Sequence, residues 1–96
     1  MYDVKMQQEY DKVTHFNKVL GEILKELRES KTKLSINKFA MEFDIDRGNL
    51  SKLENGNLGC RILTAWKIAE GMNMKLSDII KILEERLGKD FQLMDE

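Results

Sequence analysis

Residues 35–56 read SINKFAMEFDIDRGNLSKLENG and contain two short segments with the apolar spacing of amphipathic helices. In the first segment the apolar side chains that share one helix face are Ile36, Phe39, Ala40 and Phe43. Ser35 precedes this segment and Asp46 precedes the second, and both residue types cap helices by accepting a backbone N–H. The sequence therefore predicts one helix over residues 36–43 and another over residues 47–55.

The connection between these two helices is short and polar. Asp44 stands where the chain turns, and aspartate tolerates the left-handed backbone of such turns better than most residues do. Leu50 and Leu53 give the second helix its buried face, and Gly56 supplies the residue that commonly ends a helix. Two short helices joined in this way are the pattern of a helix-turn-helix, but two ordinary helices of a small bundle have similar spacing.

Upstream of this segment, apolar residues recur at alternating spacings of four and three, at Met6, Tyr10, Val13, Leu20, Leu24 and Leu27. Asn17 interrupts the series and is itself a capping residue type. We therefore expect a break or bend near Asn17, with a second helix over residues 18–29.

Downstream, two more helices are expected. The first starts at Cys60 or Arg61 and ends near Gly71, with apolar residues at Ile62, Ala65, Trp66, Ile68 and Ala69. The second runs from Ser77, as its cap, to Leu87. The predicted fold class is all-α, a compact bundle of about five helices. Its parts are an N-terminal helical extension (1–17), the helix-turn-helix domain (18–88, with the motif at 35–55) and an acidic tail (89–96).

The composition of the 96 residues fits one small domain, with 42% apolar residues, 34% charged residues and no proline. One cysteine, Cys60, and one histidine, His15, cannot supply a disulfide or the usual set of metal ligands. We expect no enzyme activity, metal or cofactor, with His15 on the surface and Cys60 partly buried. No apolar run approaches the roughly 20 residues of a membrane span, so we expect a cytoplasmic protein without a membrane partner.

The net charge of −1 hides an uneven distribution. Residues 1–27 carry −1, residues 28–67 carry +3 and residues 68–96 carry −3. A basic middle between acidic ends suits a protein whose central third meets a polyanion.

Residues 19–79 resemble the Cro/phage-repressor class of helix-turn-helix regulators, the XRE-like family of bacteria and phages. The resemblance is carried by Leu27-Arg28, Ser35 with Phe39-Ala40, Ile45-Asp46-Arg47, Leu50-Ser51-Lys52-Leu53-Glu54-Asn55-Gly56, Ile68-Ala69 and Leu76-Ser77. It implies the phage-repressor fold and a structural salt bridge between Arg28 and Glu54. Three positions depart from the family pattern: Ile36 replaces a glutamine, Asp44 a glycine and Cys60 a proline. The loss at position 36 puts one phosphate contact in doubt.

The resemblance, with the geometry of a helix in the major groove, implies a set of DNA contacts. The expected base contacts are Arg47, Gly48, Asn49, Ser51 and Lys52, with Arg47 the best reader because it can form a bidentate contact with guanine. Gly48 indicates either close backbone approach to DNA or a relaxed first helical turn. The expected phosphate contacts are Ser35, Asn37, Lys38, Asn55, Asn57 and Arg61.

The family normally binds palindromic double-stranded DNA as a dimer, so a homodimer is expected. The first candidate for its interface is the surplus apolar surface of Ile79, Ile80, Ile82, Leu83 and Leu87. The second is the Met6–Leu27 stripe, in which Asn17 would fix the register. The resemblance implies a transcriptional regulator, expected to be a repressor. Two alternatives are the antitoxin of a toxin–antitoxin pair and a helical interaction module that has lost DNA binding, a role favoured by the near-neutral charge and Ile36.

Overall fold

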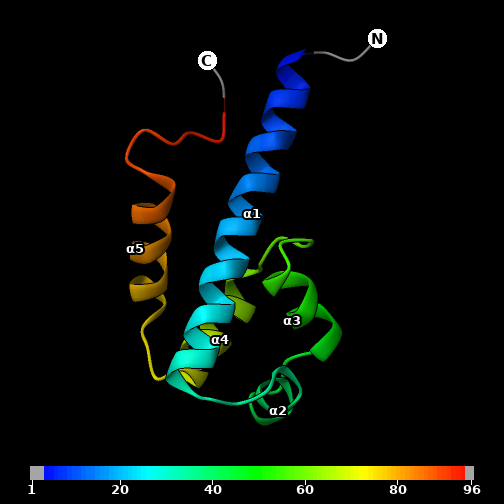
Figure 1. The fold of residues 1–96 in the computed structure, drawn as a ribbon, viewed down its shortest axis with the longest axis vertical. Coiled ribbons are helices and arrows are strands. Elements are labelled where there is room, and N and C mark those ends of the chain that lie inside the picture. The colour runs from blue at the N-terminus through cyan, green and yellow to red at the C-terminus, as the bar shows by residue number, and fades with distance from the viewer. Residues whose placement is uncertain (1–3, 95–96) are drawn as a thin grey trace.

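The computed structural model describes the backbone of residues 4–94 and the side chains of residues 11–94, and this part of the chain contains helices and no strand. Figure 1 shows the arrangement of the five helices. In chain order they are α1 (Val4–Lys31), α2 (Ile36–Glu42), α3 (Arg47–Glu54), α4 (Ile62–Gly71) and α5 (Leu76–Leu87). The expected all-α fold of about five helices is confirmed.

The helix α1 is continuous through Asn17, so the expected break there is wrong. The residues around Asn17 explain the continuity, because Phe16, Val19 and Leu20 all pack against the core and extend the apolar face across the expected break. No proline or glycine pair lies there to end the helix. Residues 4–17 therefore belong to the same helix as residues 18–31. The side chains of Met6 and Tyr10, the upper part of the expected apolar stripe, lie outside the described residues.

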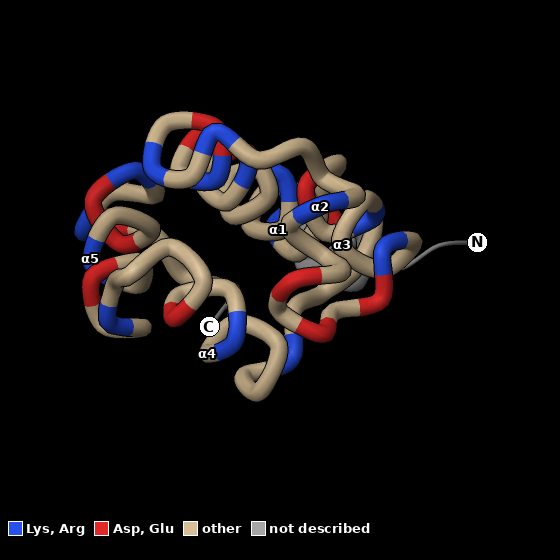
Figure 2. Tube along the Cα trace, turned by 90° about the horizontal axis from the view of Figure 1, so that it is seen from below, with Lys and Arg blue, Asp and Glu red and all other residues tan. Residues whose placement is uncertain are grey.

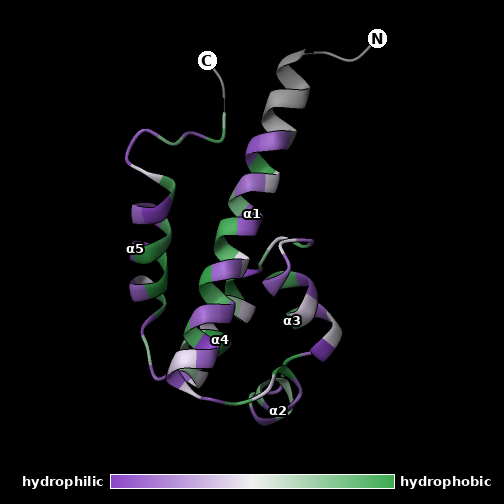
Figure 3. Ribbon diagram, in the orientation of Figure 1, coloured by the Kyte–Doolittle hydropathy of each residue, from purple (hydrophilic) through white to green (hydrophobic). Residues whose placement is uncertain are grey.

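The hydrophobic core draws one or two large side chains from each helix. Its largest fully buried members are Ile23 and Leu24 of α1, Phe39 of α2, Leu50 of α3, Ile68 of α4 and Ile79 of α5. Figure 3 shows the apolar residues of α5 on the side that faces α1. The N-terminal half of α1 extends beyond α2, α3 and α4, with only the end of α5 and the C-terminal tail beside it (Figure 1).

The turn between α2 and α3 forms as expected. Ser35 caps α2 by accepting the N–H of Lys38, at 3.2 Å from Oγ, and Asp46 caps α3 by accepting the N–H of Asn49, at 2.8 Å from Oδ1. Asp44 has the left-handed backbone with φ of 55°. The two caps fix both helix starts through contacts three residues apart in sequence.

The start of α5 differs from the expectation. The helix begins at Leu76, and the side chain of Asp78 accepts the N–H of Lys75 at 3.1 Å, whereas Ser77 lies inside the first turn and caps nothing. Asp78 also places a negative charge at the positive end of the helix. The predicted cap at Ser77 is therefore wrong.

The burial of α5 corrects the expected dimer interface. Ile79 and Leu83 are only 1% and 4% exposed, because they face α1 and belong to the core of the protein itself. Ile82 and Leu87 are half-buried against the same core, and Ile80 alone of the five residues is exposed, at 40%. One helix face thus buries more of these side chains than the sequence suggested, and Ile79 and Leu83 are unavailable to a partner.

The acidic tail folds back onto α1. The ring of Phe91 stacks on Phe16 at a centroid distance of 6.3 Å and lies 6.2 Å from the ring of His15, which is on the surface as expected. An exposed ion pair between Arg86 and Glu26, at 2.6 Å, joins α5 to α1 nearby. The tail therefore covers Phe16 of α1 beside the C-terminal end of α5.

No described helix is both long and apolar enough to cross a bilayer. The described side chains contain no group of three or more His, Cys, Asp or Glu residues that could hold a metal ion. Cys60 is half-buried as expected, and burial raises the pKa of its thiol.

Candidate nucleic-acid interface

The helix α3 has one buried face and one exposed face. Leu50 and Leu53 are 1% and 4% exposed and attach α3 to the core. Of the five expected base contacts, the structure leaves four exposed, Arg47, Gly48, Asn49 and Lys52, whereas Ser51 is half-buried. The helix therefore presents the side chains of its first turn, and Lys52 one turn later, to the solvent.

The six expected phosphate contacts are all exposed: Ser35, Asn37, Lys38, Asn55, Asn57 and Arg61. They come from the start of α2, the end of α3 and the loop that leads to α4. These positions flank α3 on both sides along the chain. The hydroxyl oxygen of Ser35 accepts the N–H of Lys38 as the cap of α2, and its hydroxyl hydrogen is the donor that a phosphate could accept.

The structure joins one expected phosphate contact to the expected base reader. The side-chain oxygen Oδ1 of Asn37 accepts a hydrogen bond from Nε of Arg47, across the turn between α2 and α3. The sequence placed these two residues in different sets and did not predict their contact. Only the crossing of α2 and α3 brings together residues ten apart in sequence.

Arg28 of α1 and Glu54 of α3 form the expected pair. Nε of Arg28 donates to Oε2 of Glu54 at 2.7 Å, and Nη2 donates to Oε1 at 2.9 Å. The remaining nitrogen, Nη1, donates to the carbonyl oxygen of Leu34 at 2.7 Å. The two side chains are 8% and 5% exposed, so a bidentate pair is buried here. The hydrogen bond with Glu54 raises the pKa of Arg28 above its ordinary value, so the guanidinium stays charged.

A second contact between α1 and α3 depends on a glycine. The backbone of Gly21 lies against the last turn of α3, where an added methyl group would be 2.7 Å from the carbonyl oxygen of Glu54 and closer still to that of Leu53. Gly56, which follows α3 with φ of +75°, packs against Lys18 of α1 in the same way. The C-terminal end of α3 is therefore held by α1, while its N-terminal end is held by α2.

Acidic residues are interspersed with basic ones along α2 and α3 (Figure 2). Most of the carboxylates have a structural partner. Lys67 of α4 donates to the carbonyl oxygen of Asp44 at 3.0 Å and lies 3.8 Å from its carboxylate, Asp46 caps α3, and Glu54 pairs with Arg28. These contacts reduce the repulsion that the carboxylates would exert on a polyanion beside α3.

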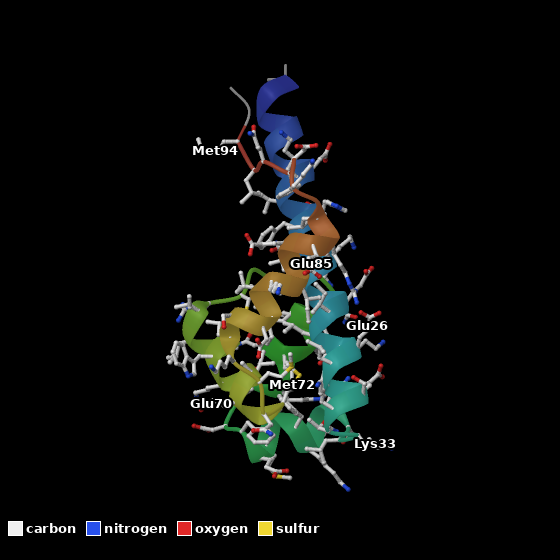
Figure 4. All side chains as sticks on the ribbon, turned by 90° about the vertical axis from the view of Figure 1, so that its left-hand side faces the viewer. Glu26, Lys33, Glu70, Met72, Glu85 and Met94 are labelled. Carbon is white, nitrogen blue, oxygen red and sulfur yellow. The ribbon has the colours of Figure 1, made fainter. Side chains whose placement is uncertain are left out.

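The helix α4 exposes several of its apolar residues. Ile62 and Trp66, two of the five apolar residues that the sequence assigns to this helix, are 75% and 56% exposed, and Leu63 between them is 68% exposed. Ile80 of α5 lines one groove with Trp66 and another with Ile62. Leu63 lies three residues before Trp66 on α4 and is therefore its neighbour on the helix surface. We call these four residues, Ile62, Leu63, Trp66 and Ile80, the α4–α5 surface. Figure 4 shows the molecule with α5 toward the viewer and Glu70 at the C-terminal end of α4.

The geometry of α2 and α3 agrees with comparisons to known proteins. The profile of the helix-turn-helix family matches residues 24–79. A control protein of a Mycoplasma species, C.MunI, is 37% identical over 65 residues, which cover 68% of this chain and 88% of that relative. The protein belongs to the XRE-type helix-turn-helix family. It is therefore a DNA-binding regulator built on the helix-turn-helix fold.

The family match leaves out both terminal parts of this helix-turn-helix protein. It includes α2, α3 and α4 entire, but it leaves out most of α1, the part of α5 after Ile79, and the tail. The contacts of Gly21 and the docking of Phe91 on Phe16 therefore belong to this chain rather than to the family profile.

Proposed function

We propose that this regulator binds a specific sequence of double-stranded DNA through the major groove and acts as a repressor. The observation that carries the proposal is the division of α3, whose buried leucines fix the helix while its polar first turn faces the solvent. An α-helix fits the major groove of B-form DNA, where each base pair presents a distinct set of hydrogen-bonding groups. A protein that occupies the groove at a promoter excludes other proteins from it.

The residues of the exposed α3 face would each make a different contact with the DNA. Arg47, with a planar set of donors, would contact O6 and N7 of a guanine. Lys52 and Asn49 would reach bases or phosphates farther along, and Gly48 would let the backbone approach the DNA. Ser51, half-buried, would contribute least.

The side chains that flank α3 would position the domain on the phosphates. They are Ser35, Asn37, Lys38, Asn55, Asn57 and Arg61, all exposed. Contacts of this kind set affinity and its dependence on salt and carry little sequence information.

We further propose a homodimer on a palindromic operator, because one domain of this size reads too few base pairs to be selective. The α4–α5 surface is our candidate for its interface, since a contiguous patch of large exposed apolar side chains marks an interaction site. Of the five residues of the expected α5 interface, Ile80 alone is exposed and belongs to this surface. Dimerisation through it must place the two α3 helices about one DNA turn, roughly 34 Å, apart.

A gel-shift titration with DNA flanking the gene tests the proposed function. The protein should bind one duplex roughly a thousandfold or more tightly than a random duplex of equal length, and the affinity should fall as salt is raised. Equal affinity for both duplexes would exclude sequence-specific binding. No binding to either duplex at low salt would leave an interaction module as the better account.

A further inference from the structure

The hydrogen bond between Asn37 and Arg47 constrains how Arg47 can face a base. Oδ1 of Asn37 accepts from Nε of Arg47, and both side chains are exposed at the beginnings of α2 and α3. The neighbouring carboxylate of Asp46 accepts the backbone N–H of Asn49 through Oδ1 as the cap of α3. Arg47 is thus anchored by an amide of another helix.

A guanidinium group offers two pairs of donors to a base. One pair is Nε with one terminal nitrogen, at the side of the group, and the other is Nη1 with Nη2, at its end. Because Asn37 occupies the hydrogen on Nε, only the end pair is left with both of its nitrogens available. Two parallel donors of this kind match O6 and N7 of guanine.

We propose that Asn37 is a specificity-determining residue, which positions Arg47 to read a guanine with Nη1 and Nη2. The inference rests on the proposed function, since it specifies how one base is chosen. It also changes the role expected of Asn37, which was that of a phosphate contact alone. The two hydrogens on Nδ2 of Asn37 stay available to the DNA, so one side chain couples the position of the backbone to the reading of a base.

Two substitutions separate positioning from phosphate contact. Asn37→Ala removes the acceptor for Nε, whereas Asn37→Asp keeps an acceptor that holds a guanidinium more strongly but repels phosphate. Lys38→Ala is the matched control, because Lys38 is the next residue of α2, is equally exposed, and has no contact with Arg47 among the described side chains.

The experiment is selection of duplexes from a randomised library by the wild-type protein and the three variants, followed by sequencing. A good bidentate contact gives a preference of roughly 5- to 150-fold for its base. We expect Asn37→Ala to lose this preference at one position in each half-site and to keep the preferences at other positions. Asn37→Asp should keep the guanine preference with lower affinity for every sequence, and Lys38→Ala should do the same.

Four results would overturn the inference. If Asn37→Ala keeps the full guanine preference, or if it lowers the affinity for all sequences alike, Asn37 acts on phosphates only. If Asn37→Asp loses the preference as Asn37→Ala does, the acceptor oxygen has no role in positioning. If the wild-type protein selects no sequence, the proposed function is wrong as well. In the other results the wild-type protein still selects a sequence, so only the role of Asn37 is wrong. Circular dichroism of each variant checks that these exposed substitutions leave the helices folded.

Discussion

Arg28 links three parts of the chain through one side chain. Its guanidinium donates to both carboxylate oxygens of Glu54 and to the carbonyl oxygen of Leu34, in a site with almost no exposure to water. Removing one partner of a buried pair leaves the other charge without water or a counterion, which costs far more than the pair itself contributes. The pair therefore fixes α3 against α1 and against the connection to α2.

Glu54→Ala should lower the free energy of unfolding by about 3–5 kcal/mol, because the charge of Arg28 is stranded. The double substitution Arg28→Met with Glu54→Leu should cost much less than the two single substitutions added together, since it leaves no buried charge. Urea denaturation of Glu54→Ala, of the two single substitutions Arg28→Met and Glu54→Leu, and of their combination measures both effects.

The exposed pair of Arg86 and Glu26 is the control for this prediction, with side chains 42% and 58% exposed. Glu26→Ala should change the stability by about 1 kcal/mol or less, because water screens the pair. A cost for Glu54→Ala as small as that for Glu26→Ala would contradict the view that the buried pair fixes α3.

Local contacts at this scale could be predicted from the sequence, and distant ones could not. Ser35 and Asp46 cap N–H groups three residues away, so the residue types alone located the starts of α2 and α3. Arg28 and Glu54 are 26 residues apart and were paired only through the family resemblance. Nothing local marks the bond between Asn37 and Arg47, because it depends on the crossing of two helices.

At the scale of elements, α1 holds α3 through a close approach that only glycine allows. Gly21 faces the carbonyl oxygens of Leu53 and Glu54, which belong to the backbone and cannot rotate away as a side chain can. A larger residue at position 21 must therefore push α3 away from α1. Such a shift moves the whole reading helix, including its exposed first turn.

Gly21→Ala should lower the free energy of unfolding by about 1–3 kcal/mol, although alanine by itself favours a helix. Gly59→Ala is the control, since an added methyl group there meets no atom within 4 Å and the backbone has ordinary φ. Thermal unfolding of both variants compares the two sites. An increase in stability for Gly21→Ala would show that α3 adapts to the added methyl without cost.

The extents of α1 and α5 show why element boundaries were harder to predict than helix positions. Asn17 is a common cap, but here the apolar residues around it pack against the core and keep the helix continuous. Ser77 is also a common cap, but Asp78 takes that role because its side chain reaches back to the N–H of Lys75. In both cases the residue type suggested a cap, but another contact determined where the helix begins.

At the scale of the whole molecule, the α4–α5 surface is the largest departure from the sequence interpretation. The sequence indicated five apolar residues in α4 without showing which of them face inward, and Ile62 and Trp66 are exposed. Conversely, α5 buries Ile79 and Leu83, which were expected to face a partner. The proposed dimer interface therefore moves from the middle of α5 toward α4.

Leu63→Glu and Trp66→Glu should each produce a folded monomer, because both side chains are exposed in the protomer and a charge between two apolar surfaces opposes association. Sedimentation equilibrium at micromolar concentration measures the change. Met41→Glu is the control, since Met41 on α2 is 79% exposed and lies outside this surface. Variants that remain dimeric would place the interface elsewhere, with the Met6–Leu27 stripe as the next candidate.

The proposed function requires that α3 enter the major groove and that Arg47 contact a guanine there. Dimethyl sulfate interference on a duplex selected by the protein tests it, because the reagent methylates guanine N7 in the major groove and adenine N3 in the minor groove. We predict that methylation of N7 at one guanine in each half-site abolishes wild-type binding, and that Arg47→Ala loses this sensitivity. Interference confined to adenine N3, or the same N7 pattern for the wild type and Arg47→Ala, would contradict the account.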